Sequence, residues 1–289
     1  MANNSYTVVI PTHNRGIELV GKAVASALAQ SVPPTEVIVV DDGSKKPIAP
    51  SLAEHFPGQP VRVIRHEQGR GAQPARLAGV MAATAPVVAL LDSDDWWEPH
   101  KMAAQLAALE AQGGASLIAS RVWIEGQGAP KVRPHAVLQA VERIEHYLFV
   151  RRGLLQTSTH VAAREVMVEL LQASAHTMVQ HDPSIAIEAQ QRGYPVIQLA
   201  EPLSHFSCAE TYARISTGKS QALAAEAWLR DYAKAWPSLV WDGYMVNHHV
   251  EMLLKGGETR KAIGVFLKHY RPMFGWRPLV PLMRNLLRK

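Results

Sequence analysis

Residues Val87–Pro99 read VVALLDSDDWWEP, an apolar run followed at once by a cluster of acids. The apolar part has the length and composition of a buried β-strand. Asp92, Asp94 and Asp95 stand where this strand is predicted to end, and carboxylates so close together repel one another. Hard divalent cations take oxygen ligands, and Mg²⁺ typically combines protein carboxylates with phosphate oxygens. The stretch therefore predicts a metal ion beside a phosphate-bearing ligand; capping of the following helix is the alternative, but a single acid suffices for that.

The rest of the N-terminal half alternates short apolar runs with helical patterns. The other runs, each bounded by turn or polar residues, are Thr7–Ile10, Val37–Val40, Val61–Ile64 and Leu117–Val122. Apolar residues recur at the helical period over Ile17–Ala29, Gly71–Ala83 and Lys101–Ala111. Near-continuous apolar strands that alternate with helices predict an α/β fold with a mainly parallel sheet covered on both faces.

Short polar residues follow several of these predicted strands. The first strand ends in Pro11–Arg15 (PTHNR), the second in Asp41–Ser44 (DDGS) and the fourth in the acid cluster. Ligands of parallel sheets bind at the carboxyl ends of the strands. We therefore expect a polar ligand next to the metal at this edge of the sheet.

The pattern weakens beyond Ile124, where glycines and prolines indicate a loop. A further strand is predicted over Gln156–Val161 and another over Val196–Leu199. His181-Asp182-Pro183 predicts the start of a helix that runs to Gln191, with Asp182 as its N-cap and Pro183 in its first turn. From Gln221 to the C-terminus the sequence is predicted to be mostly helical.

Composition indicates a globular protein. The chain has 289 residues, of which 47% are hydrophobic and 19% charged, enough for a large α/β domain with a smaller appendage. The single cysteine, Cys208, excludes an internal disulfide and fits a reducing compartment. We expect neither a signal peptide nor a membrane-spanning helix.

The net charge of +5 is concentrated at the C-terminus. From Lys255 onward there are nine Lys and Arg and one acid, so this tail carries +8 and the remainder −3. Its apolar residues at helical spacing are Leu279, Leu282, Met283, Leu286 and Leu287. A basic amphipathic helix on a mildly acidic body suggests an anionic membrane surface as partner, rather than nucleic acid. The alternative is a terminal helix that docks on its own domain.

Four motifs together resemble the N-terminal half of the family 2, GT-A-fold, inverting glycosyltransferases: VVIPTHNR, VIVVDDGS, GRGAQPARLAGV and VVALLDSDDWWEP. The resemblance runs over Val8–Val122 and more weakly to Ser216. It implies a Rossmann-like, mainly parallel sheet flanked by helices, with a helical C-terminal extension. The implied domains are a glycosyltransferase domain at 1–220, with a nucleotide-binding half (1–122) and an acceptor half (123–220), and the extension at 221–289.

The resemblance also implies a reaction and its participants. The donor is a nucleotide-diphospho-sugar, with UDP favoured, the cofactor is Mn²⁺ or Mg²⁺, and the acceptor is a hydroxyl of a glycan or a lipid-linked molecule. Family members suggest a product in bacterial surface polysaccharide or lipopolysaccharide. The expected location is the cytoplasm, with a peripheral position on the inner face of the cell membrane if the tail binds lipid.

Site residues on the donor side follow from the matched motifs. The residues implied to line the nucleotide pocket are Pro11, Thr12, Asn14 and Arg15. Asp42 would recognise the base, Asp94 would lie near the ribose or sugar, and Asp95 would ligate the metal. Arg76 would face the donor, although Leu77 stands where the family often has asparagine.

Three further residues of the second half complete the implied site. Asp182, in Gln180-His181-Asp182, matches the acid that takes the proton of the acceptor hydroxyl. His205 would complete the metal shell or touch phosphate, and Arg214 would neutralise charge on the departing diphosphate. Two alternatives remain open, a sugar-nucleotidyltransferase and a non-catalytic nucleotide-sugar-binding or scaffold protein. The sugar, the acceptor and the linkage are not determined by the sequence.

Overall fold

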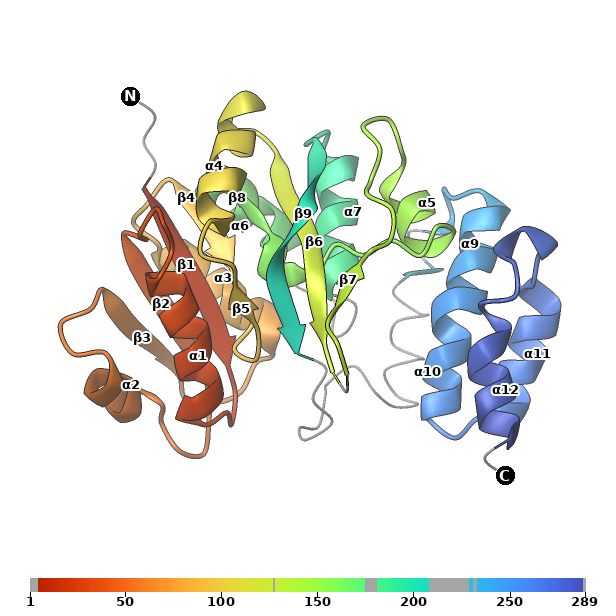
Figure 1. Ribbon diagram of the computed structural model, residues 1–289, viewed down its shortest axis with the longest axis horizontal. Coiled ribbons are helices and arrows are strands. Elements are labelled where there is room, and N and C mark those ends of the chain that lie inside the picture. The colour runs from red at the N-terminus through yellow and green to blue at the C-terminus, as the bar shows by residue number, and fades with distance from the viewer. Residues whose placement is uncertain (1–4, 127, 175–180, 208–228, 231–232, 288–289) are drawn as a thin grey trace. The chain divides into compact units, whose positions relative to one another are not determined.

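The computed structural model describes residues 5–126, 128–174, 181–207, 229–230 and 233–287. The chain divides into two compact units, and a single mixed sheet forms the middle of the first (Figure 1). The first unit comprises Met1–Ala140, Leu154–His176 and His181–Ala209. The second comprises Val141–Gly153, Thr177–Gln180 and Glu210–Lys289.

The nine-stranded sheet has the strand order β3-β2-β1-β4-β8-β6-β9-β5, and β7 pairs with β6 off this path. Its strands are β1 (Tyr6–Thr12), β2 (Glu36–Asp42), β3 (Val61–His66), β4 (Val87–Leu90), β5 (Trp96–Trp97), β6 (Leu117–Glu125), β7 (Lys131–Arg133), β8 (Val161–Ala163) and β9 (Val196–Ser207). Strands β1 to β4 are mutually parallel, as are β6 and β9, whereas β5, β7 and β8 run antiparallel to their partners. The predicted α/β fold with a mainly parallel sheet is confirmed.

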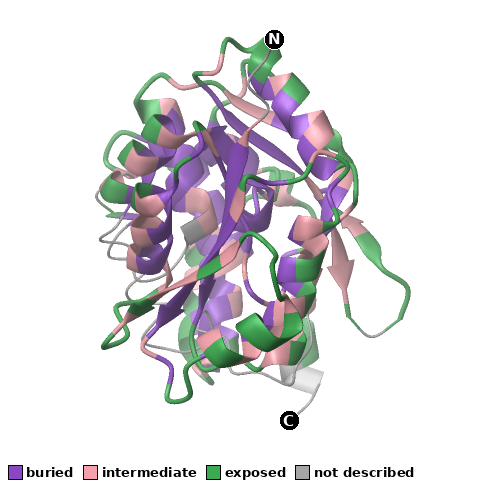
Figure 2. Cartoon of the chain, turned by 90° about the vertical axis from the view of Figure 1, so that its left-hand side faces the viewer, coloured by how far each residue is buried: buried purple, intermediate pink, exposed green. Residues whose placement is uncertain are grey.

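Helices cover both faces of this sheet. Those of the first unit are α1 (Ile17–Leu28), α2 (Ala49–His55), α3 (Ala72–Ala82), α4 (Lys101–Ala111), α6 (Arg164–Ala173) and α7 (His181–Gln191). Helices α1 and α4 pack on one face with Val8 and Ile10, and α3 packs on the other face against Val9. Figure 1 shows α1 and α4 in front of the sheet and α3 and α6 behind it. Strands β1 and β2 are accordingly almost entirely buried, and Figure 2 shows the buried residues gathered in the middle of the sheet.

Gly79 permits the close approach of α3 to the sheet. A Cβ atom at this position would lie 2.4 Å from Val9 Cγ1 and 3.0 Å from Val40 Cγ2. We expect Gly79→Ala to lower the free energy of unfolding by about 1–3 kcal/mol because the added methyl overpacks a buried contact. Urea denaturation would measure the change. Gly264→Ala is the control, since no atom lies within 4 Å of the added methyl, and it should raise stability slightly. Equal midpoints for Gly79→Ala and wild type would contradict this packing.

The structure differs from the sequence prediction in three places. The predicted strand Gln156–Val161 is instead a 3-10 turn, η1 (Thr157–Thr159), followed by β8, because its hydroxyls bind distant carboxylates. The predicted strand Val196–Leu199 continues to Ser207, since its second half pairs with β6 and β5. Asp182 is the second residue of α7 and therefore not its N-cap.

The second unit is helical in its described part. It contains α5 (Ile144–Phe149), α9 (Ser238–Tyr244), the π-helical turn η2 (Met245–His249), α10 (Val250–Lys255), α11 (Thr259–His269), the 3-10 turn η3 (Pro272–Phe274) and α12 (Leu279–Leu287). Val250, Phe266 and Leu282 are among its core residues. The predicted C-terminal helices are therefore present, and α5, from the predicted acceptor half, groups with them. The predicted boundary at residue 220 lies outside the described residues. None of the helices that the structure describes is long and apolar enough to cross a bilayer.

Candidate active site

The loops that follow β1 and β2 are joined by hydrogen bonds. The backbone N–H of Asn14 donates to Ser44 Oγ at 2.8 Å, and Asn14 Oδ1 accepts from the Lys45 N–H at 2.8 Å. His13 Nδ1 lies 2.7 Å from the carbonyl oxygen of Asp42. Asn14 has a φ of 52°, in the left-handed region that asparagine tolerates better than most residues. Asn14 therefore acts as a bridge that shapes the predicted nucleotide pocket.

Pro11 and Thr12 end β1 and are both buried. The hydroxyl of Thr12 has no hydrogen-bond partner among the residues that the structure describes. A buried polar atom without a partner costs free energy, so it is a natural contact for a polar ligand. This atom lies at the carboxyl end of the strand next to β2, where Thr12 is in register with Asp41.

Asp41 is a structural acid. Its buried carboxylate accepts hydrogen bonds from the N–H groups of Ser44 and Ile48 and pairs with Arg65. Burial alone would raise the pKa of Asp41, but these hydrogen bonds outweigh it and hold the pKa below its ordinary value. The ionised group thus fixes the turn after β2.

Asp42, the predicted base-recognising residue, is also bonded to its own chain. Its carboxylate accepts from the N–H groups of Arg70, at 3.0 Å to each oxygen, and Gly71, at 2.7 Å, and lies 2.7 Å from His66 Nδ1. Burial would raise the pKa of Asp42, yet the bonds from Arg70 and His66 leave it below the ordinary value. Asp42 therefore organises the turn before α3. A direct contact between its carboxylate and a base requires one of these hydrogen bonds to break.

The acids after β4, Asp92–Asp95, which we call the acid loop, are partly neutralised by two arginines. Arg76 of α3 is buried and its guanidinium donates to Asp92 Oδ1. Arg15 pairs with Asp94 across 3.5 Å. The side chains of Asp92 and Asp94 retain 25% and 31% of their exposure, so both can still be reached by a ligand. The ends of β1 and β4 and the helix α3 thus meet at the acid loop, as predicted for this edge of the sheet.

Asp95 is the buried acid of the loop, with 1% exposure. Its Oδ2 accepts from Gln156 Nε2 at 2.7 Å and Ser158 Oγ at 2.6 Å, and its Oδ1 accepts from the Ser207 N–H at 3.0 Å. Burial, together with the charges of Asp92 and Asp94, raises the pKa of Asp95 well above its ordinary value. A cation bound at the acid loop would relieve this repulsion.

Asp182 lies half-buried at the start of α7. Its Oδ1 accepts from the backbone N–H of Thr157 at 2.8 Å and from the Thr157 hydroxyl. Burial raises the pKa of Asp182, the bonds from Thr157 oppose that rise, and the charge of Asp92 adds to it. Arg76 acts in the opposite direction. Asp182 lies near the acid loop, because Thr157, which binds it, is followed directly by Ser158, which binds Asp95.

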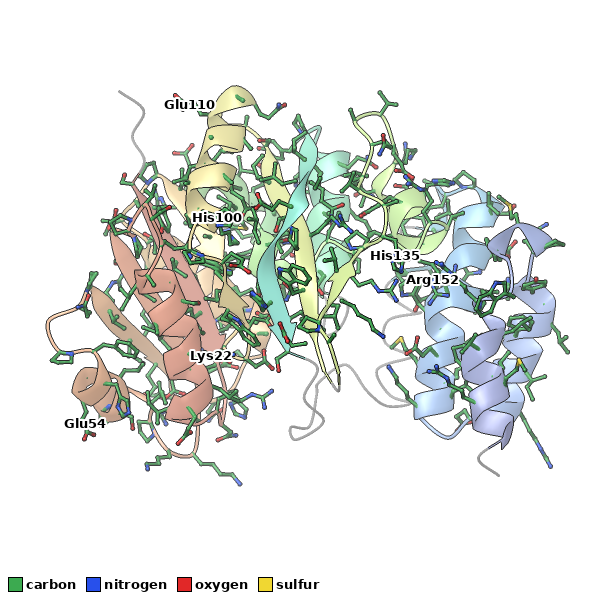
Figure 3. All side chains as sticks on the ribbon, viewed as in Figure 1. Lys22, Glu54, His100, Glu110, His135 and Arg152 are labelled. Carbon is green, nitrogen blue, oxygen red and sulfur yellow. The ribbon has the colours of Figure 1, made fainter. Side chains whose placement is uncertain are left out.

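His205, the second predicted metal ligand, lies on β9 and is bound to two carboxylates from other parts of the first unit. Its Nε2 lies 2.9 Å from Glu98 Oε1 and its Nδ1 lies 2.7 Å from Glu125 Oε1. The imidazole stacks on Trp96 with 4.9 Å between ring centroids, and Lys22 of α1, labelled in Figure 3, covers the Trp96 ring at 2.8 Å. His205 thus lies in a strand rather than in a loop over the donor, and its two nitrogens have partners already.

Two predictions are left without a structural outcome. Arg214 lies outside the described residues. In the part of the chain that is described, no group of three or more His, Cys, Asp or Glu side chains is arranged to hold a metal.

Several buried polar residues of the site were missed by the sequence interpretation. They include the three residues of the Gln156–Ser158 turn. They also include two basic residues, Lys101 and His160, which are fully buried. Burial holds the pKa of Lys101 well below its ordinary value, and its Nζ lies 4.0 Å from the centroid of the Trp97 ring. Burial, with the charge of Arg76, lowers the pKa of His160 to about 3, so His160 is neutral. Nothing in the helical or strand periodicity marks these positions.

The acids and arginines lie at the carboxyl edge of the parallel strands, which is where open α/β sheets bind their ligands. Residues 7–168 match glycosyl transferase family 2, which is more than half of the chain. The protein belongs to this family and is a glycosyltransferase with a GT-A-like fold.

The chain is also similar to individual proteins. It is 29% identical to the amylovoran biosynthesis glycosyltransferase AmsB of Erwinia amylovora over 228 residues, covering 76% of this chain and 75% of AmsB. It is 37% identical to the succinoglycan biosynthesis protein ExoO of Rhizobium meliloti over 107 residues, which are 37% of this chain and 30% of ExoO. The structure of S. aureus TarS in complex with UDP-GlcNAc matches with a TM-score of 0.65 at 15% identity, covering 96% of this chain and 84% of that one. At this identity the TarS match shows the fold alone.

Proposed function

We propose that the protein transfers a sugar, with inversion, from a UDP-sugar to a hydroxyl of a glycan or lipid-linked acceptor. The observation that carries this proposal is that two adjacent residues bind the two groups: Thr157 binds Asp182, and Ser158 binds Asp95 of the acid loop. One side of the site can hold a diphosphate, and the other presents a carboxylate base. The similarity to AmsB and ExoO supports an acceptor in the synthesis of bacterial surface polysaccharide or lipopolysaccharide.

The choice of UDP rests on two lines of support. TarS, whose fold this chain shares, was solved with UDP-GlcNAc. Thr12, whose hydroxyl is buried without a described partner, is in register with Asp41, the residue before Asp42, where the resemblance implies that the base binds. A GDP or dTDP donor would meet the same pocket, so the donor has to be measured.

The acid loop fits a divalent cation, Mn²⁺ or Mg²⁺. Its donor set is carboxylate oxygen. Burial is the main cause of the raised pKa of Asp95, and the charges of Asp92 and Asp94, which a cation would neutralise, add to it. Asp94 pairs with Arg15 but keeps 31% of its exposure, whereas Asp95 has 1% exposure and both ring nitrogens of His205 are bound to carboxylates. We therefore propose Asp94 as the first ligand and keep Asp95 and His205 as alternatives. The bound ion would supply charge neutralisation for the departing diphosphate.

The chain's own residues would perform the remaining steps. Asp182 accepts the proton of the acceptor hydroxyl, so that the oxygen can attack the anomeric carbon from the face opposite the diphosphate. Arg15 and Arg76 hold the acid loop in place. Arg214 is assigned to the diphosphate by the resemblance alone.

A panel of nucleotide sugars tested by thermal shift, with and without Mn²⁺, measures the proposed donor. A ligand at one hundred times its dissociation constant stabilises the folded state by about 2.7 kcal/mol. We expect UDP-sugars with Mn²⁺ to give the largest shift. If none of the nucleotide sugars produced a shift, the donor proposal would be rejected, although the fold would not be contradicted. UDP binding without any turnover would favour the scaffold alternative, and synthesis of a nucleotide sugar from a sugar phosphate would favour the nucleotidyltransferase.

We further propose that the second unit contacts anionic lipid. The predicted stripe of α12 is not free for this, because Leu282 is buried in the core of the unit and Leu279 packs against that core. Among the described residues of the second unit, the exposed large apolar ones are Val141, Leu267, Met273, Trp276 and Met283. Trp276 lies in an exposed connection between Arg271 and Arg277. A tryptophan flanked by basic residues suits the interface of an anionic membrane.

Cosedimentation with vesicles tests this contact. We expect the protein to bind vesicles that contain phosphatidylglycerol more tightly than pure phosphatidylcholine vesicles, and Trp276→Ala to weaken that binding. Glu110→Gln, an exposed substitution on α4 of the first unit, serves as the control (Figure 3). Equal binding to both vesicle types would reject the lipid contact.

A further inference from the structure

The Gln156–Ser158 turn is buried although all of its side chains are polar. The exposures of Gln156, Thr157 and Ser158 are 1%, 0% and 0%. Buried polar side chains are stable where partners satisfy them. Here the partners are carboxylates from both sides of the candidate site.

Thr157 binds a single oxygen of Asp182. Its backbone N–H donates to Oδ1 at 2.8 Å, and its hydroxyl donates to the same atom. No residue in the described ranges donates to Oδ2 of Asp182. One carboxylate oxygen, Oδ1, is thus fixed by Thr157.

Ser158, the next residue, binds the acid loop. Its hydroxyl accepts from the Asp92 N–H at 3.0 Å and donates to Asp95 Oδ2 at 2.6 Å. Gln156 donates to the same Asp95 oxygen at 2.7 Å. The acid loop is therefore tied to the turn through its first and last residues.

We propose that this turn is a positioning element that sets both halves of the site, with Thr157 orienting the base Asp182 and Ser158 orienting the acid loop. The inference rests on the proposed function, because it takes Asp182 as the base and the acid loop as the donor site. Thr157 and Ser158 are adjacent and point to different groups, so the two roles can be separated by mutation.

The electrostatic surroundings of Asp182 support a role for the Thr157 hydroxyl. Burial and the charge of Asp92 raise the pKa of Asp182, whereas Thr157 and Arg76 lower it. Loss of the hydroxyl removes one lowering contribution, so the pKa of Asp182 should rise further. A base must be deprotonated to act, and a higher pKa moves the acid limb of the rate profile to higher pH.

The first test compares Thr157→Val with Thr157→Ser. We expect the acid limb of the kcat/KM–pH profile to move up by about one pH unit in Thr157→Val, as one hydrogen bond to a charged group is lost, and to stay in place in Thr157→Ser. The shift produced by UDP with Mn²⁺ in thermal melting should be unchanged in both. If Thr157→Val does not fold, Thr157→Ala provides the same comparison.

The second test uses Ser158→Ala, which should weaken the stabilisation by UDP and Mn²⁺ while leaving the acid limb at its wild-type pH. A purely structural turn would move both readouts in both variants, and that result would overturn the inference. An unshifted acid limb in Thr157→Val would overturn it too. If Asp182→Asn is inactive in that case, the proposed function survives; if Asp182→Asn remains active, the proposed base itself is wrong.

Discussion

Asp182→Asn should lower kcat by about 10²–10⁴-fold, the usual contribution of a general base. The amide has nearly the same shape, and its oxygen can still accept the N–H of Thr157, so the fold should be kept. It cannot accept the proton of an acceptor hydroxyl. Steady-state transfer assays with the donor identified by thermal shift would measure the loss.

Two measurements make this result specific. Binding of UDP with Mn²⁺ to Asp182→Asn should match wild type, because Asp182 acts on the acceptor side. Glu201→Gln, which alters an exposed carboxylate bound to His100, should transfer sugar at the wild-type rate (Figure 3). Transfer by Asp182→Asn within about threefold of wild type, far less than the loss expected for a missing base, would show that another group takes the proton.

Asp94→Asn should abolish the metal-dependent part of donor binding and lower transfer by about 10²–10³-fold, since a catalytic metal contributes several kcal/mol to the stabilisation of charge. The protein should fold normally. The Arg15–Asp94 pair is partly exposed and its atoms are 3.5 Å apart, so its loss costs about 1 kcal/mol or less. Thermal shifts with UDP, with and without Mn²⁺, would separate metal-dependent from metal-independent binding.

Asp95→Asn is the informative comparison. Asp95 is buried and bonded to Gln156, Ser158 and Ser207, and burial with the charges of Asp92 and Asp94 raises its pKa. We therefore expect Asp95→Asn to retain more of the Mn²⁺ response than Asp94→Asn. If Asp95→Asn lost more of the Mn²⁺ response than Asp94→Asn, Asp95 would be the metal ligand, as the resemblance implied.

Much of the fold was predictable because the parallel strands are short apolar runs. No polar side chain occurs in the runs Val37–Val40 and Val87–Leu91, so both runs favour buried strands. The polar residues after them were equally informative, since the edge of a parallel sheet is where ligands bind. The contact of Arg15 with Asp94 joins two of these predicted ends.

The parts that could not be predicted depend on contacts distant in sequence. A strand was predicted over Gln156–Val161, but Thr157 and Ser158 bind carboxylates 25 and 63 residues away. Lys101 was not predicted to be buried because lysine is almost never fully buried without a partner. His205 matched a loop position of the family, yet pairing with Trp96 makes it part of a strand. No local pattern contains these contacts.

Calorimetric titration of UDP into the wild-type protein, with Mn²⁺ and again after its removal with EDTA, tests the central claim that the acid loop binds a diphosphate through a divalent ion. We expect saturable binding with Mn²⁺ and at least tenfold weaker binding in EDTA, which is about 1.4 kcal/mol. Equal affinity under both conditions, or no binding with Mn²⁺ present, would contradict it.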